Sequence, residues 1–142
     1  MSDAPSIAAV VPTLGTSPYL RRCLEALGGP AVGVRRYVVL QGEINAAADW
    51  APFAERVIGA PARLGFSAAT NLGLSAALVT PDAGTTEWVA TVNDDAVVEP
   101  GWANALRATL ERDPRAASAQ GVNLRLLDPE RVDGWGLAWN RR

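Results

Sequence analysis

Apolar and polar positions along the chain follow two different periods, which predict short strands separated by helices. Continuous apolar runs predict buried strands at 6–12, 34–42, 56–61 and 85–92. Apolar residues three and four positions apart predict helices at 17–27, from about 67 to 79, and at 101–112. A weaker helix or irregular segment is expected at 45–56, where Pro52 interrupts the pattern, and strands and turns are expected from 117 to 142.

The ends of the first helix are marked by residues that favour helix termini. Ser17 predicts the N-cap with Pro18 at the first helical position, and Gly28 and Gly29 predict the end. Cys23 falls inside the apolar pattern of this helix, where a small core residue is a better expectation than a reactive thiol.

The helix that begins near Ser67 is predicted to bury Leu72, Ala76 and Val79 along one stripe. Gly73 lies in its interior and costs about 1 kcal/mol relative to alanine. A helix here therefore implies that close packing or a ligand requires this glycine.

The order of strands and helices predicts an α/β fold with a mainly parallel sheet and flanking helices. The run at 85–92 is apolar enough for a central strand covered on both faces. No repeat or linker divides the sequence, so we expect one domain over 1–142. Ligands of such sheets bind beyond the carboxyl ends of the strands, where this chain places Pro12 and Thr13, residues 41–43 and residues 93–95.

The composition removes several kinds of chemistry. The chain has no histidine and no lysine, so all 13 basic residues are arginine. Nucleophiles paired with histidine, histidine metal sites, Schiff-base lysines and the phosphate-loop lysine are therefore excluded within this chain. The single cysteine excludes an internal disulfide and a multi-cysteine zinc site.

Net charge and hydropathy limit the partners and the location. The net charge of −2 and the pI near 5.1 argue against nucleic-acid binding. No apolar run reaches the roughly 18 residues of a membrane span, and the start of the chain lacks the features of a secretory signal. We expect no nucleic-acid partner, no transmembrane segment, and a cytoplasmic location that includes the cytoplasmic face of the membrane.

Two adjacent carboxylates, Asp94 and Asp95, follow the run at 85–92. Their mutual repulsion at the end of a buried strand must be offset by hydrogen bonds, an arginine or a cation. Mg²⁺ and Mn²⁺ suit such a site, because they bind one or two carboxylates together with water and substrate phosphates. The alternative is a simple turn that caps the strand, since Asn and Asp are favoured in turns.

Three segments together resemble the family 2 glycosyltransferases, which have the GT-A (Rossmann-like) fold. They read IAAVVPTLGTSPYLRRCLEAL, RLGFSAATNLGLSAA and WVATVNDDAVVEPGWANALRATLERDP, and they stand in the family's order over nearly the whole chain. The branch that they resemble most contains rhamnosyltransferase-like enzymes, in which NDD commonly replaces a stricter D-x-D. This resemblance implies the N-terminal nucleotide-sugar-binding portion of such an enzyme, of the kind used in cell-wall or polysaccharide biosynthesis.

The resemblance also implies roles for residues at the strand ends. Pro12 and Thr13 match positions that lie against the nucleotide base. Asp94 matches a position facing the ribose and diphosphate, and Asn93 is expected among the nucleotide-sugar-binding residues beside it. Asp95 matches the principal ligand of Mn²⁺ or Mg²⁺, with Asp94 as a second ligand.

Other positions match the family less closely. Asn71 matches an asparagine of the donor pocket, although a solvated helix position is the alternative. Gln41 and Glu43 stand where the family usually has an aspartate that holds base and ribose, so the donor is in question. Arg63 replaces a common asparagine and would contact diphosphate oxygens, or else is a solvated loop residue.

The reaction implied by the resemblance is inverting transfer of a sugar from a nucleoside diphosphate to a hydroxyl of a glycan or lipid-linked acceptor. The family's catalytic base lies in a later acceptor-binding half, which is absent from this sequence. The acidic residues Asp128, Glu130 and Asp133 do not match its motif, so we expect a chain truncated at its C-terminal side.

Two other functions remain open: a non-catalytic nucleotide-binding or assembly module, and a GT-A-like nucleotidyltransferase. The second lacks the glycine- and lysine-containing phosphate signature of that group. Finally, the alternation of Trp135, Leu137 and Trp139 predicts a face that either self-associates or packs in an ordinary core.

Overall fold

The computed structural model describes residues 6–42, 46–60, 62–79 and 86–134. The chain forms two compact units, which are residues 1–99 and residues 100–142. The single domain expected from the sequence over residues 1–142 stays a prediction.

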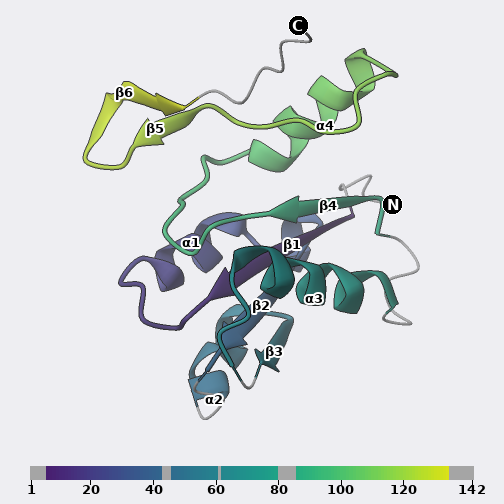
Figure 1. Cartoon of the computed structure of the whole chain (residues 1–142). Helices are drawn as coiled ribbons and strands as arrows, with labels where there is room; N and C mark the ends of the chain where they lie inside the picture. Colours follow the sequence, from purple (N-terminus) through teal and green to yellow (C-terminus); the bar gives the residue numbers. More distant parts are fainter. Residues whose placement is uncertain (1–5, 43–45, 61, 80–85, 135–142) are drawn as a thin grey trace, which may run out of the picture. The chain divides into compact units, whose positions relative to one another are not determined.

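A four-stranded, all-parallel sheet forms the centre of the first unit (Figure 1). Its strands lie in the order β3-β2-β1-β4, which is compatible with a Rossmann-like fold. They are β1 (Ile7–Thr13), β2 (Val34–Gln41), β3 (Arg56–Ala60) and β4 (Trp88–Thr91). The predicted α/β class with a parallel sheet is therefore confirmed.

The position predicted for the fourth strand is wrong. Within the described residues β4 pairs only with β1 and forms an edge of the sheet. Partly covered and exposed residues alternate along it, and Val89 is 46% exposed. The inner strands are β1 and β2, and every residue of β1 is buried. An apolar run indicates burial of a strand without fixing its place in the sheet, because that place depends on distant pairing.

Helices cover both faces of the sheet (Figure 1). On one face α3 (Phe66–Val79) packs Ala69 and Ala77 against Val10, Tyr37 and Val39. The other face is covered by α1 (Leu20–Leu27), whose buried residues are Leu20, Cys23, Leu24 and Leu27. The segment between β2 and β3 forms the short helix α2 (Ala47–Trp50) and the 3₁₀ turn η3 (Ala51–Phe53), and a second such turn, η1 (Pro30–Val32), precedes β2.

The first helix begins later than predicted. Tyr19, not Ser17, occupies its N-cap position, and the Ser17 hydroxyl makes two other hydrogen bonds. That hydroxyl accepts a hydrogen bond from the Tyr19 backbone N–H at 3.3 Å and donates one to the Asp94 carbonyl oxygen at 3.3 Å. The predicted end is confirmed: Gly28 has φ +95° and donates to the Glu25 carbonyl oxygen.

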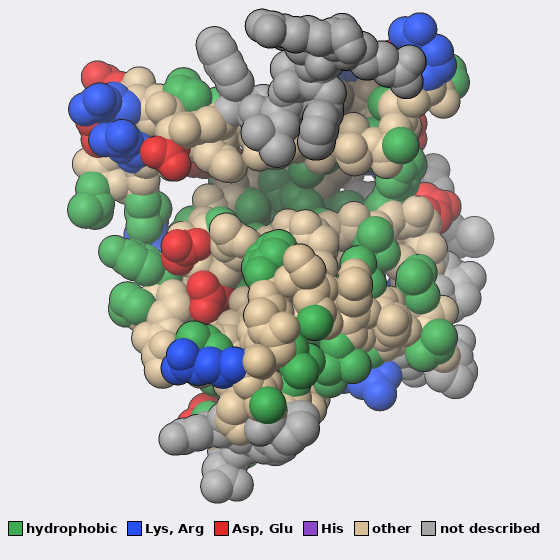
Figure 2. Space-filling model, viewed as in Figure 1, with side chains coloured by type: hydrophobic (Ala, Val, Ile, Leu, Met, Phe, Trp, Pro, Cys, Tyr) green, Lys and Arg blue, Asp and Glu red, His purple; other side chains and the backbone are tan. Residues whose placement is uncertain are grey.

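The stripe predicted for α3 is also wrong. Leu72 and Val79 are 36% and 77% exposed, and the buried residues are Ala69, Thr70, Gly73 and Ala77. A helix that lies very close to a sheet buries its smallest side chains and leaves its larger ones outside. Phe66, Leu78 and Val79 are accordingly exposed, and Figure 2 shows apolar side chains spread over the face on which α3 lies.

A partly buried ion pair ties the start of β2 to its neighbours. Arg36 Nη2 lies 2.7 Å from Glu55 Oε1, and Arg36 Nη1 donates to the Leu24 carbonyl oxygen of α1 at 3.2 Å. Burial alone would raise the pKa of Glu55, but hydrogen bonds from the Arg36 side chain and backbone outweigh it and lower that pKa. The link therefore holds a helix, a strand and the segment before β3 together.

The second unit contains α4 (Trp102–Arg112) and a hairpin of β5 (Asn123–Arg125) and β6 (Asp128–Gly134). Both the helix and the strands match the expectations. Trp135, Leu137 and Trp139 lie outside the described residues, so self-association stays a prediction. No helix in the described ranges has the length and apolar character needed to cross a membrane.

Candidate functional site

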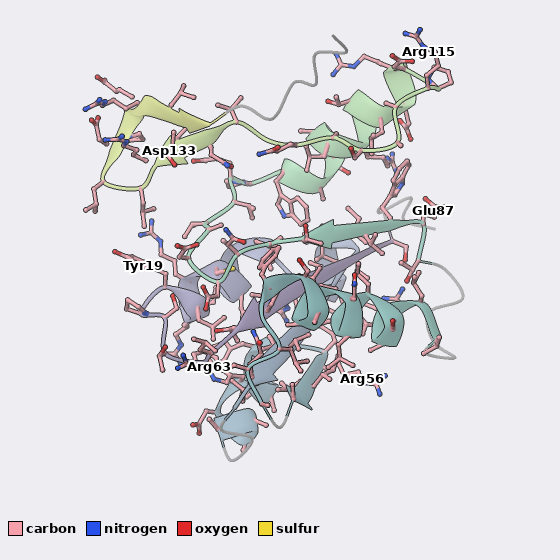
Figure 3. The ribbon with its side chains drawn as sticks, in the orientation of Figure 1. Tyr19, Arg56, Arg63, Glu87, Arg115 and Asp133 are labelled. Carbon is pink, nitrogen blue, oxygen red and sulfur yellow. The ribbon has the colours of Figure 1, made fainter. Side chains whose placement is uncertain are left out.

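The site lies where neighbouring connections leave the sheet in opposite directions. From β1 the chain runs to β2 on one side, whereas β4 joins β1 on the other. This geometry opens a crevice at the carboxyl ends of the strands. Figure 3 shows Tyr19 and Arg63 at this end of the sheet, and Arg56 and Glu87 at the opposite end.

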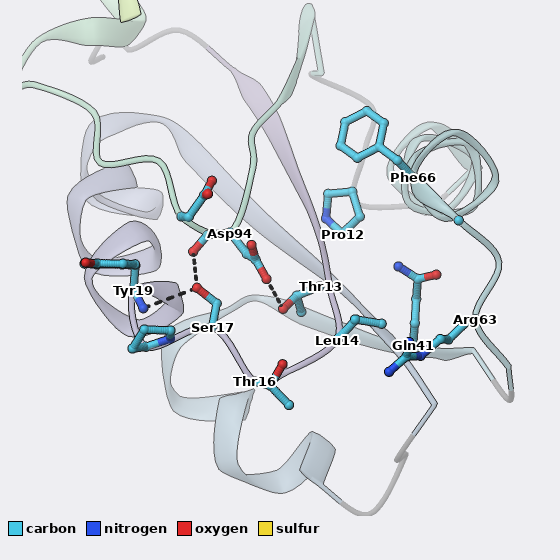
Figure 4. Close-up of a pocket in the computed structure, with 13 residues that line it drawn as sticks. Pro12, Thr13, Leu14, Thr16, Ser17, Tyr19, Gln41, Arg63, Phe66 and Asp94 are labelled. Carbon is cyan, nitrogen blue, oxygen red and sulfur yellow. Dashed lines mark hydrogen bonds between the residues drawn. The ribbon is translucent and has the colours of Figure 1, made fainter. Parts of the chain in front are cut away.

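A cleft of about 630 Å³ occupies this crevice within the first unit (Figure 4). Its volume falls within the range typical of small-molecule sites. It is lined by Pro12, Thr13, Leu14, Thr16, Ser17, Pro18, Tyr19, Gln41, Arg63, Gly65, Phe66, Asp94 and Asp95.

Thr13 joins the two strands that border the crevice. It ends β1 and is only 3% exposed. Its hydroxyl donates to Asp94 Oδ2 at 2.5 Å and accepts a hydrogen bond from the Gly15 backbone N–H at 2.9 Å. The single hydroxyl thus fixes both the loop after β1 and one carboxylate of the acidic pair (Figure 4).

A turn after β4 presents the acidic pair. The Ala96 backbone N–H donates to the Asn93 carbonyl oxygen at 3.1 Å, which places Asp94 and Asp95 at the two central positions of the turn. Asp94 is partly buried, and Asp95 is exposed. The turn considered as an alternative is therefore present, and it displays both carboxylates at the cleft.

Cys23 of α1 contacts this turn through its thiol. Its thiol is fully buried and donates to the Asn93 carbonyl oxygen at 3.4 Å. Burial, followed by the negative charges of Asp94 and Asp95, raises the pKa of Cys23 to about 12. The thiol therefore remains protonated at neutral pH, which confirms the prediction of a buried core residue.

The acidic pair fits a cation that takes most of its ligands from elsewhere. The hydrogen bond from Thr13 occupies one oxygen of Asp94, which leaves its other oxygen and both oxygens of Asp95 for a metal. Across the described residues no group of three or more His, Cys, Asp or Glu side chains gathers to hold a metal ion. Mg²⁺ or Mn²⁺ would fit here with water and phosphate oxygens as its remaining ligands.

The opposite wall of the cleft combines an amide, a cation and an aromatic ring. The side chain of Gln41 is 8% exposed, and its Oε1 accepts a hydrogen bond from the Leu64 backbone N–H at 2.9 Å. Arg63 and the 56%-exposed Phe66 line the cleft beside it (Figure 4). Apolar and charged groups therefore stand next to one another on this side.

The predicted site residues separate into three groups. The cleft brings together six of them: Pro12, Thr13, Gln41, Arg63, Asp94 and Asp95. Asn71 lies on the exposed side of α3, and Asn93 contributes its carbonyl oxygen to the turn, so neither is among the lining residues. Glu43 lies outside the described residues. The roles assigned to all of them stay predictions.

Several residues that line the cleft are not predicted from the sequence. Leu14, Ser17 and Tyr19 belong to the loop after β1, and Phe66 is the first residue of α3. The rule that ligands bind beyond the strand ends points to this loop as a whole. No local pattern separates its cleft-facing side chains from the others.

No model of a known protein family matches the chain, and no curated protein matches it either.

Proposed function

We propose that this chain binds the nucleoside-diphosphate donor of a glycosyltransferase with the GT-A fold, of the family 2 type. The observation that carries the proposal is the hydrogen bond from Thr13 to Asp94. It couples the end of β1, where the base and ribose would lie, to the carboxylates that would hold a metal ion on the diphosphate. The sheet order and the cleft at the strand ends support the same function.

The lining of the cleft offers groups for each part of such a donor. Phe66, Pro12 and Leu14 offer apolar surface for a base. Arg63 and the N-terminal end of α3 offer positive charge and free backbone N–H groups for phosphate oxygens. Asp94 and Asp95 repel phosphate oxygens by themselves, so a diphosphate requires a cation between them.

In this proposal Asp95 would be the principal ligand of Mn²⁺ or Mg²⁺, which would supply positive charge for the diphosphate when bound. Asp94, held by Thr13, orients the pair and faces the ribose. The acceptor would be a hydroxyl of a glycan or of a lipid-linked sugar.

Calorimetry with UDP, GDP, dTDP and CDP, with and without Mn²⁺, tests the proposal. We expect one of these nucleotides to bind only when Mn²⁺ is present, and Asp95→Ala to weaken that binding at least about tenfold, since a metal ligand is lost. Asp49→Ala is the control, because Asp49 is exposed on α2 and does not line the cleft. If none of the four nucleotides binds in a Mn²⁺-dependent way, the proposal is overturned.

One observation favours a non-catalytic nucleotide-binding module as the second candidate. Among the described residues, the lining of the cleft contains no carboxylate besides Asp94 and Asp95, so these residues supply no separate base for an acceptor hydroxyl. An assay of sugar transfer and of donor hydrolysis with a panel of nucleotide sugars separates the two functions. Measurable turnover excludes the module, whereas tight binding without turnover supports it.

A further inference from the structure

The orientation of the Gln41 side-chain amide is fixed by its neighbour. An amide oxygen and nitrogen are ordinarily assigned from their hydrogen-bond partners. Here the partner is the Leu64 backbone N–H, which can only donate, so the atom 2.9 Å from it must be the oxygen Oε1. Because the side chain is almost fully buried, the amide has little freedom to turn over.

The nitrogen of this amide faces the cleft. Figure 4 shows the Gln41 side chain reaching between Arg63 and Pro12, with its nitrogen on the side of Pro12. Within the described residues Nε2 makes no hydrogen bond, and it is not among the fully buried polar atoms that lack a partner. Gln41 therefore presents N–H groups, and no acceptor, to whatever occupies this part of the cleft.

The surroundings of this nitrogen suit a flat ring. Phe66 and Leu14 line the cleft with 56% and 39% of their surfaces exposed, and Pro12 of β1 lines it as well. An aromatic ring and apolar side chains beside one directional donor are the arrangement that fixes a heterocycle by its face and by one edge.

We infer that Gln41 fixes which edge of the base enters this part of the cleft: the base atom that meets Nε2 is an acceptor, either a ring carbonyl oxygen or an unprotonated ring nitrogen. A base that presents an N–H at this point leaves two donors facing each other. The inference rests on the proposed function, because it concerns the base of the same nucleoside diphosphate. A side-chain carboxylate at this position would select the opposite pattern.

The substitution Gln41→Glu replaces the hydrogen-bond donor that faces the cleft with an acceptor and keeps the length of the side chain. One carboxylate oxygen still accepts from the Leu64 N–H, while the other replaces the donor Nε2. For the nucleotide that binds the wild type best, we expect an affinity loss on the order of tenfold or more. Binding of inorganic pyrophosphate with Mn²⁺, which has no base, should change by less than about twofold.

The outcomes separate this inference from the proposed function. If the wild type binds no nucleoside diphosphate with Mn²⁺, the proposed function fails. If it binds one and Gln41→Glu binds it equally well, the assignment to Gln41 fails alone. An equal loss for pyrophosphate also overturns it, because the effect is then charge repulsion.

A measurement on the unmodified protein covers the case in which the variant does not fold. The chain has two glutamines, Gln41 and Gln120, so selective ¹⁵N labelling of glutamine side chains gives two amide groups to follow. Gln120 is exposed in the second unit and serves as the internal control. We expect the nucleotide to shift the Gln41 amide signals downfield, whereas pyrophosphate with Mn²⁺ should not. Unchanged Gln41 signals with a saturating nucleotide overturn the inference.

Discussion

The hydroxyl of Thr13 shows how much of the site depends on one small group. It serves as donor to Asp94 and as acceptor for the Gly15 N–H, and it is almost completely buried between them. Buried groups that lose their only partner are costly, because they cannot return to water. Removal of this hydroxyl therefore takes a hydrogen-bond partner from both the Asp94 carboxylate and the Gly15 N–H.

We predict that Thr13→Val lowers the free energy of unfolding by about 1–3 kcal/mol, although valine has nearly the same shape. It should also weaken Mn²⁺-dependent nucleotide binding, because Asp94 is no longer held. Thr16→Val is the control, since Thr16 lines the same cleft but is exposed. Urea unfolding and calorimetry of both variants check this, and equal effects would contradict the role given to Thr13.

Cys23 leads to a prediction about alkaline pH. Its pKa in the folded chain is about 12, against an ordinary value of 9.0. Above pH 9 the unfolded chain releases this proton and the folded chain retains it, so folding stability falls as the pH rises towards 12. The expected slope from this residue is up to about 1.4 kcal/mol per pH unit.

Urea unfolding between pH 8 and pH 11 measures that slope. Comparison with Cys23→Ser isolates the thiol, because every other ionisable side chain is the same in both proteins. The wild type should lose stability more steeply than the variant above about pH 9. Parallel curves would show that the thiol is not protected by its surroundings.

Among the elements, α3 depends on a close approach to the sheet. A Cβ atom on Gly73 would lie 2.3 Å from Val10 Cγ1 and 2.9 Å from Val39 Cγ2, so no side chain fits there. The helix accepts the low helical propensity of glycine because β1 and β2 lie directly beneath it. The position of α3 in turn sets where Phe66 stands at the cleft.

We therefore predict that Gly73→Ala destabilises the protein by about 1–3 kcal/mol, even though alanine is the better helix former. Ser75→Ala in the same helix should be neutral or slightly stabilising, because Ser75 is exposed. Thermal unfolding of the two variants makes the comparison. A stabilised Gly73→Ala protein would mean that α3 lies farther from the sheet.

The helices and strands also show which features of the fold local sequence patterns can predict. The four strands and the helices α1, α3 and α4 are predicted because burial produces continuous apolar runs or helical spacing. The stripe of α3 was predicted wrongly because the rule expects large apolar residues inside, and here contact distance selects small ones. The edge position of β4 escaped prediction because strand order is set by pairing between distant segments.

The same limit applies to the candidate site. Residues at or shortly beyond the carboxyl ends of strands, such as Thr13, Gln41 and Asp94, are predicted from the rule that ligands bind at strand ends. Their partners were not: neither the bond from Thr13 to Asp94, across 81 positions, nor that from Leu64 to Gln41 leaves a local signal. The polarity of the Gln41 amide follows only from three-dimensional contact.

At the scale of the whole molecule, all the described residues that line the cleft belong to the first unit. The parallel sheet and the helices on both its faces also lie within 1–99. We therefore predict that a fragment of residues 1–99 folds and binds the same nucleotide as the full chain, within about threefold in affinity.

Circular dichroism, urea unfolding and calorimetry of this fragment check the prediction. A cooperative transition with unchanged nucleotide affinity is the expected result. A fragment that lacks a cooperative transition, or that folds without binding the nucleotide bound by the full chain, would show that the second unit contributes to the site.

The burial of Cys23 has a practical consequence for spectroscopy. A protonated thiol without solvent access reacts poorly with maleimide and other thiol reagents. This chain is thus close to a cysteine-free background, and a cysteine introduced at an exposed position such as Ser75 can carry a dye or spin label selectively. Paired labels on 1–99 and 100–142 would then report the distance between the two units in solution, with and without nucleotide.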